Sequence, residues 1–137
     1  SYGARKSFDG QVVTVKCFED NSRVKELLAA EGAGKVLVVD GGASMRCALM
    51  GDLIAESAVK NNWNGVIIYG CVRDVDAIAA LDLGVHALAS IPQKSNRKGV
   101  GEVDVSLHFG QVTFNSGDYV YADNNGIIVA KEKLVDL

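Results

Sequence analysis

Residues 65–74 read GVIIYGCVRD, and residues 35–42 read KVLVVDGG. Each stretch is an uninterrupted apolar run that ends abruptly at glycine and charged side chains. Apolar runs without polar alternation are typical of strands that are buried on both faces of a parallel sheet. The two stretches therefore predict parallel strands over residues 35–39 and 65–69, each followed by a loop with polar side chains.

Helical and strand-like segments alternate around these two strands. Helices are expected over 23–30, with Ser22 as N-cap, over 45–61, where Gly51 divides a short helix from a longer one, and over 75–81. Further strands are expected over 11–17, 85–89, 102–109, 111–114, 119–122 and 126–130. A parallel centre with an antiparallel last third indicates one mixed α/β sandwich over residues 1–137.

The composition argues against several classes of protein. A chain of 137 residues can bury the core of one domain, and its net charge of −3 argues against direct nucleic-acid binding. Three cysteines without a CxxC pair argue against a disulfide framework or a zinc site and favour a reducing, cytoplasmic setting. No apolar run approaches the ~20 residues of a membrane span. The chain starts at Ser1 without methionine or a signal peptide, so we expect it to begin inside a longer protein.

Candidate site residues follow the strand over 65–69. Ligands of open parallel sheets bind at the carboxyl ends of the strands, where Arg73 and Asp74 lie. An arginine there can bind a carboxylate with two hydrogen bonds, and an aspartate can bind a hard cation such as Mg²⁺. The alternative is structural: Arg73 pairs with a nearby acid, and Asp74 caps the helix that starts at Val75. Spacing alone leaves both interpretations open.

A second candidate is the sequence Gly51-Asp52-Leu53-Ile54 at the expected start of a helix. Free backbone N–H groups at a helix N-terminus bind anions, and Asp52 could orient a water molecule for proton transfer. The structural alternative is that Gly51 breaks the helix and Asp52 is its N-cap, and local sequence alone favours this alternative.

Other polar residues are weaker candidates. His86 lies in an apolar strand and is expected in the core or behind a site, whereas His108 is expected to face solvent. Lys94, Arg97 and Lys98 form a small basic cluster that reads as a solvated loop. The cysteines lie in apolar surroundings and are expected to be structural.

The candidate residues form the spacing D-x20-R-D, from Asp52 to Arg73 and Asp74. With VVDGG (38–42), GDLI (51–54), YGCVRD (69–74) and GDYVYAD (117–123), the chain resembles the family of the regulator of RNase E activity A (RraA) and the 4-hydroxy-4-methyl-2-oxoglutarate aldolases. The resemblance covers essentially the whole chain. Each motif is weak alone, but the set in this order is specific.

The resemblance implies a fold like the swivelling phosphohistidine-type β/β/α domain, and homotrimers or dimers of trimers with the site at the subunit interface. Enzymatic members are class II lyases that depend on a divalent metal and act on 2-oxo acids. By this resemblance Arg73 binds the substrate carboxylate and stabilises an enolate, and Asp74 holds Mg²⁺ or Mn²⁺. The amides of Gly51, Asp52, Leu53 and Ile54 seat the carboxylate, and Asp52 orients a water molecule.

One departure bears on the reaction. Aldolase members carry a longer C-terminal segment with an acidic residue for the neighbouring subunit, whereas this chain ends at Val135-Asp136-Leu137. The expected activity is therefore oxaloacetate decarboxylation, with aldol cleavage as the less expected alternative. The N-terminus is also shorter than that of the family, so a helix is expected to be missing there. The alternative function is a non-catalytic regulator that binds and inhibits a ribonuclease of the RNase E type, and a third is a structural domain without activity.

Overall fold

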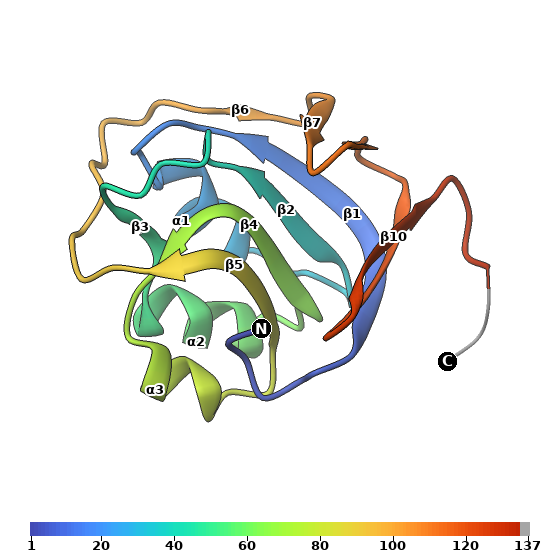
Figure 1. Ribbon diagram of the computed structural model, residues 1–137, viewed down its shortest axis with the longest axis horizontal. Helices are drawn as coiled ribbons and strands as arrows, with labels where there is room; N and C mark the ends of the chain where they lie inside the picture. Colours follow the sequence, from blue (N-terminus) through green and yellow to red (C-terminus); the bar gives the residue numbers. More distant parts are fainter. Residues whose placement is uncertain (135–137) are drawn as a thin grey trace.

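The computed structural model describes residues 1–134, which build a curved mixed sheet with helices on one side (Figure 1). The helices are α1 (Ser22–Leu28), α2 (Asp52–Lys60) and α3 (Val75–Ala79). The sheet contains β1 (Phe8–Lys16), β2 (Val36–Asp40), β3 (Ala48–Met50), β4 (Gly65–Val72), β5 (Gly84–Ser90), β6 (Glu102–Val103), β9 (Tyr119–Asp123) and β10 (Gly126–Ala130). A separate hairpin is formed by β7 (Leu107–Phe109) and β8 (Val112–Phe114).

The strand order is β10-β9-β1-β2-β4-β3, with β5 paired to β4 and β6 paired to β1. All pairings among β1 to β5 are parallel, and those of β6, β9 and β10 are antiparallel. On one side of β4, β2 pairs with residues 65–69 and β3 with residues 71–72, while β5 runs along its other side. The parallel strands thus present their carboxyl ends at one edge, as the sequence predicted.

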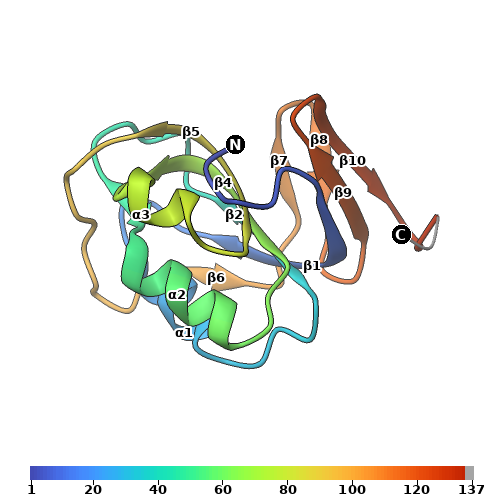
Figure 2. The same cartoon turned by 90° about the horizontal axis from the view of Figure 1, so that it is seen from below.

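The three helices cover one face of the parallel strands, as Figure 2 shows from below. Strand residues of even and odd number point to opposite faces, so Leu37 and Val39 turn toward the helices. They pack with Val24 and Leu28 of α1 in the larger of two hydrophobic cores. This burial, rather than the propensity of such short helices, stabilises α1 to α3.

The other face of the same strands carries a second core. Val36 and Val38 point there and pack with Leu107 and Phe114 of the β7–β8 hairpin and with Val120 of β9. The strand β1 joins the two halves, since its residues 8–11 pair with β9 and its residues 12–16 pair with β2. The layers are therefore β/β/α, and the predicted mixed sandwich is confirmed.

Several local predictions were wrong. The short helix expected before Gly51 is instead the strand β3, because Ala48 and Met50 pair with the end of β4. The strand β4 continues to Val72, so Gly70 to Val72 are strand rather than loop. The strand expected over 102–109 is interrupted near Asp104, where φ is +61°, and becomes β6 and β7. The N-cap of α1 is Asn21, not Ser22, which is the first residue of the helix.

Within residues 1–134, none of the helices is both long and apolar enough to cross a membrane.

Candidate active site

The end of β4 places Arg73 and Asp74 beside the start of α2. The backbone N–H of Arg73 donates a hydrogen bond of 3.0 Å to the carbonyl oxygen of Met50, which fixes the end of β4 to the end of β3. Asp74 then takes a left-handed conformation with φ of +57°, which aspartate tolerates better than most residues. This turn carries its side chain back toward α2 rather than over α3.

The carboxylate of Asp74 is the centre of a small polar cluster. Its Oδ2 atom accepts a hydrogen bond of 3.1 Å from the backbone N–H of Asp52 and another of 2.8 Å from Nη1 of Arg73. The side chains of Arg73 and Asp74 remain 21% and 35% exposed, so a ligand can reach both. The cluster therefore joins an anion, a cation and a helix N-terminus at one point.

Gly51 makes this contact geometrically feasible. A Cβ atom at this position would lie 2.7 Å from both Cζ of Arg73 and Oδ2 of Asp74. These distances are shorter than van der Waals contact, so any side chain at residue 51 would displace the pair. The absence of a side chain at Gly51 thus allows the ends of the Arg73 and Asp74 side chains to lie against the backbone at the start of α2.

The surroundings hold the carboxyl group of Asp74 in its ionised form. The hydrogen bond from the Asp52 backbone contributes most to lowering the pKa of Asp74. Partial burial opposes this effect, and the charges of Arg73 and Lys94 lower the pKa further.

An ionised carboxylate that remains partly exposed, such as that of Asp74, is the oxygen donor that Mg²⁺ and Mn²⁺ prefer. Among residues 1–134 no group of three or more His, Cys, Asp and Glu side chains could hold a metal, so a cation at Asp74 would take few protein ligands. Mg²⁺ commonly binds in this way, with waters and substrate completing its shell.

The structure brings together the residues proposed from the sequence. Gly51, Asp52, Arg73 and Asp74 meet directly. The side chains of the other two do not join them, since Leu53 is 71% exposed and Ile54 is buried in the larger core. The structural alternatives are partly correct. Arg73 does pair with an acid, which is Asp74 itself, and Asp74 holds the N-cap position of α3, although its side chain makes no capping hydrogen bond. The N-cap of α2 is Gly51, so the alternative role of Asp52 as N-cap is wrong.

A polar cavity of about 410 Å³ opens beside Arg73. It is lined by Asn21, Ala48, Arg73, Lys94, Ser95, Asn96 and Arg97. The prediction of a solvated loop is therefore correct, because its cations are exposed. It was incomplete, because Lys94 and Arg97 also line the same cavity as Arg73. The sequence did contain a signal, because this loop follows β5 at the edge where β2 and β4 end.

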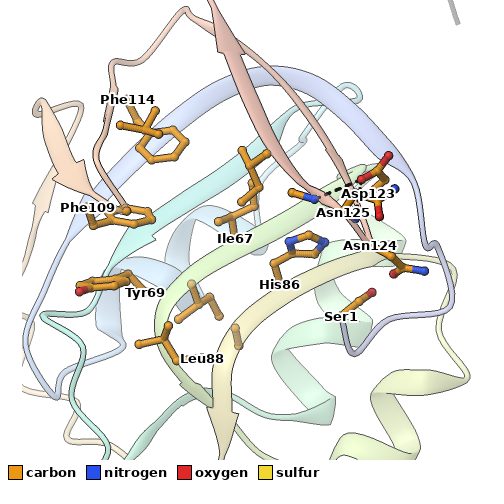
Figure 3. Close-up of a pocket in the computed structure, with 16 residues that line it drawn as sticks. Ser1, Ile67, Tyr69, His86, Leu88, Phe109, Phe114, Asp123, Asn124 and Asn125 are labelled. Carbon is orange, nitrogen blue, oxygen red and sulfur yellow. Dashed lines mark hydrogen bonds between the residues drawn. The ribbon is translucent and has the colours of Figure 1, made fainter.

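A larger cavity of about 500 Å³ lies on the other face of the sheet and shares no lining residue with the polar cavity (Figure 3). Tyr69, Phe109 and Phe114 form its aromatic wall, with ring centroids 4.7 and 4.8 Å apart. His86 points into it, and its buried Nε2 atom has no hydrogen-bond partner among the described residues. Burial lowers the pKa of His86, and its ring packs edge-on against Phe8. This histidine therefore lies away from the charged cluster.

The positions of His108 and the three cysteines agree with the predictions from the sequence. His108 is exposed and hydrogen-bonds Thr113, as expected for a solvent-facing side chain. Cys17, Cys47 and Cys71 are buried and free, as expected for structural cysteines. The C-terminal departure at Val135-Asp136-Leu137 lies outside the described residues.

These features define a class of protein, a β/β/α sandwich with an arginine–aspartate pair and a helix N-terminus at the carboxyl ends of its parallel strands. Comparison with known proteins gives the family. The profile described as "RraA-like: Aldolase/RraA" matches residues 1–129, and the chain belongs to this RraA-like family.

Three relatives illustrate the family. A protein from Acinetobacter baylyi named "Putative 4-hydroxy-4-methyl-2-oxoglutarate aldolase" is 79% identical over 99% of this chain and 80% of its own length. The solved structure of "the RNA-processing inhibitor RraA from Thermus thermophilis" is 42% identical, with a TM-score of 0.97 over 100% of this chain and 84% of that one. A Geobacillus kaustophilus structure described as an S-adenosylmethionine: 2-dimethylmenaquinone methyltransferase is 47% identical, with a TM-score of 0.95 over 97% and 83% of the two chains. The two solved structures share the fold of this chain, whereas the three names give three different activities.

Proposed function

We propose that this protein is a divalent-metal-dependent class II carbon–carbon lyase that acts on 2-oxo acids. The observation that carries the proposal is the carboxylate of Asp74, which is held between Arg73 and the first backbone N–H of α2. The names of close relatives as aldolases support the same class of reaction.

The residues of the cluster match the needs of such a reaction. Breaking the bond between C3 and C4 of a 2-oxo acid leaves its electron pair on C3 as an enolate, which must be stabilised and then protonated. The positive charge of Arg73 stabilises the substrate carboxylate and the developing enolate. The amides of Gly51 to Ile54 other than that of Asp52, which donates to Asp74, seat the carboxylate. Mg²⁺ or Mn²⁺ at Asp74 would supply further stabilisation of the enolate charge. Asp52 orients the water molecule from which C3 receives its proton.

Two reactions fit this scheme. Decarboxylation of oxaloacetate releases C4 as CO₂ and needs little beyond stabilisation of the enolate. Aldol cleavage of 4-hydroxy-4-methyl-2-oxoglutarate also requires removal of the proton from the 4-hydroxyl group. Oxaloacetate decarboxylation is therefore the first activity to measure.

The test is oxaloacetate decarboxylation by the purified chain with Mg²⁺, repeated after EDTA and against a blank that contains only the metal. Turnover above the blank that EDTA abolishes and Mg²⁺ restores would support the lyase. A folded protein without any rate above the blank, for oxaloacetate and for the aldol substrate alike, would reject it.

A regulator of ribonuclease is the second candidate, since a structure 42% identical to this chain is described as an RNA-processing inhibitor. The excess negative charge of this chain could meet basic segments of an RNA-binding enzyme. Binding to a purified ribonuclease of the RNase E type, measured at low and high salt, separates the two candidates. Salt-sensitive binding with inhibition of cleavage would support the regulator, and its absence at low salt would count against it.

We also propose a homotrimer or a dimer of trimers in the cytoplasm, with the cluster close to a subunit boundary. The three reduced cysteines fit that setting. Light scattering coupled to gel filtration gives the assembly mass, and a monomer at micromolar concentration would contradict the proposed assembly.

A further inference from the structure

The polar cavity beside Arg73 is distinctly cationic. Arg73, Lys94 and Arg97 line it, and no acidic side chain appears among its lining residues within the described part of the chain. Arg73 donates to Asp74, so its charge is partly balanced. Lys94 and Arg97 make no ion pair among residues 1–134, so no carboxylate contacts either cation directly, although the charge of Lys94 reaches Asp74.

Backbone contacts hold the loop that carries these cations. The N–H of Ala48 donates to the carbonyl oxygen of Gln93 at 2.8 Å, and the N–H of Asn96 donates to that of Glu19 at 2.9 Å. Ala48 also forms an isolated β-bridge with Lys94. In Figure 1 this loop runs from the end of β5 past β3. Lys94 and Arg97 are therefore attached to a segment fixed against the same strands that carry the site.

A second set of contacts fixes the end of the loop. The buried carboxylate of Asp20 accepts a hydrogen bond of 2.7 Å from the backbone N–H of Lys98. The side chain of Asn21 is also buried, donates to the carbonyl oxygen of Leu49 at 3.1 Å and accepts from Nε of Arg97 at 3.3 Å. Asn21 is thus a positioning residue, which leaves the terminal nitrogens of the Arg97 guanidinium for other partners.

We infer that Lys94 and Arg97 form a subsite for the second carboxylate of a dicarboxylic 2-oxo acid. This inference rests on the proposed function, in which Arg73 and the α2 amides take the first carboxylate. Arg73 lines the cavity and also contacts Asp74, so a substrate held at the cluster extends naturally toward Lys94 and Arg97. The two cations have no carboxylate in contact, and they lie beside the proposed site for a 2-oxo acid. This arrangement favours binding of a ligand with two negative charges over binding of a monocarboxylate such as pyruvate.

The subsite also bears on the choice between the two reactions. A second carboxylate that is retained keeps its contacts with Lys94 and Arg97 until the bond has broken. A carboxylate that leaves as CO₂ loses its charge during the same step, so these contacts stabilise the substrate more than the transition state. The subsite therefore favours aldol cleavage, in which the carboxylate on the departing fragment is kept, over decarboxylation.

The direct test is titration calorimetry of the full chain with Mg²⁺, with 2-oxoglutarate and pyruvate as probes. The variants are Lys94→Gln and Arg97→Gln, and Lys98→Gln is the matched control, because its side chain lies outside the cavity lining. Affinity for 2-oxoglutarate should fall about 10-fold or more for each lining cation removed, with pyruvate affinity unchanged. Lys94→Arg should retain most of the affinity.

Several results would overturn the subsite. These are equal losses for both probes, no loss for 2-oxoglutarate, an equal loss in Lys98→Gln, or no binding of 2-oxoglutarate to the unmutated chain. Because binding is measured without turnover, a chain that binds 2-oxoglutarate through Lys94 but has no lyase activity would reject the proposed function and keep the subsite.

Kinetics provide a second readout. In the double variant that carries both Lys94→Gln and Arg97→Gln, kcat/KM for 4-hydroxy-4-methyl-2-oxoglutarate should fall at least about 10-fold, because a contact kept in the transition state is lost. For oxaloacetate, KM and kcat should rise together and kcat/KM should change less. Deuterium exchange of the pyruvate methyl protons, which needs only the first carboxylate, should stay unchanged. A larger loss for oxaloacetate than for the aldol substrate would contradict the assignment.

Discussion

The backbone N–H of Asp52 lies 3.1 Å from Oδ2 of Asp74, so the first turn of α2 is joined directly to the end of β4. This hydrogen bond connects two segments that are 22 residues apart in the chain. It also contributes most to lowering the pKa of Asp74. Disturbing either segment should therefore change the position and the charge of the same carboxylate.

Gly51→Ala tests the close packing of this cluster. The added methyl group would lie 2.7 Å from Asp74 Oδ2 and from Cζ of Arg73, so both side chains must move. We expect lyase kcat/KM to fall at least about 10-fold, because misplacement of catalytic groups by about 1 Å is costly. The cluster lies at the surface edge, so the thermal midpoint should fall by only a few degrees. Ala55→Gly on the same helix is the control for helix stability, and equal activity of Gly51→Ala and the unmutated chain would contradict the packing argument.

Replacement of Arg73 tests the charge at the end of β4. Arg73→Ala should lower kcat/KM for the proposed lyase by at least about 10²-fold, as the loss of one stabilising donor does elsewhere. Arg73→Lys should recover only part of this loss, because an ammonium group cannot make the paired contacts of a guanidinium. Lys60→Ala, at the exposed end of α2, serves as control for the loss of a positive charge. Full activity of Arg73→Ala would remove Arg73 from the site.

The buried carboxylate of Asp20 should make the stability of the protein depend on pH. Burial alone would raise its pKa, but hydrogen bonds from Ser22 and from the backbone of Lys98 outweigh burial and lower it. Because the pKa in the folded protein lies below the unfolded value, this stabilisation is complete above the unfolded pKa. It is lost as pH falls through the folded-state pKa.

Asp20→Asn should therefore reduce the free energy of unfolding at neutral pH by about 1–3 kcal/mol, since an amide offers only one acceptor oxygen for two donors. The difference from the unmutated chain should shrink in acid. Urea denaturation at several pH values measures both effects, with the exposed Asp76→Asn as control. A difference that is constant with pH would show that ionisation of Asp20 has no part in stability.

The cysteines should be inert in the folded protein. Burial, followed by the nearby carboxylates of Asp20 and Asp40, raises the pKa of Cys17 to about 12, and burial also raises the pKa values of Cys47 and Cys71. Thiolate is the reactive form, so none of the three should react with iodoacetamide at pH 8 within hours. All three should react after unfolding in guanidinium chloride, as mass spectrometry would detect. Rapid labelling of Cys17 in the folded chain would refute this expectation.

The sequence predicted those parts of the molecule that depend on local pattern. The apolar runs of β2 and β4 and the polar residues after them are visible without any partner, so the parallel edge followed directly. The residues alone left the roles of Asp52, Arg73 and Asp74 open, and the family resemblance joined them as one site. The strand β3 was missed because Ala48, Leu49 and Met50 favour helix by propensity. Their pairing with β4 decides their conformation, and such a tertiary contact has no local signature.

Local sequence also did not predict the proposed subsite formed by Lys94 and Arg97. A loop with Lys94 and Arg97 has the composition of an ordinary solvated segment. Its position depends on backbone bonds to Glu19 and Ala48, which are distant in sequence. The buried Asn21 that orients Arg97 reads in sequence only as a turn residue beside a helix.

The pairing of β1 with β9 has a consequence for synthesis of the chain. Phe8 faces Ala122 across this pair, so β1 receives this partner only after the segments from α1 to β8 have been made. Until then the nascent sheet exposes Val12, Val36, Val38 and Ile67 on the face that the last third of the chain covers. Exposed apolar strands of this kind favour aggregation and bind chaperones. Interrupted translation before β9 should therefore yield insoluble fragments, although every residue proposed for the site would already have been made.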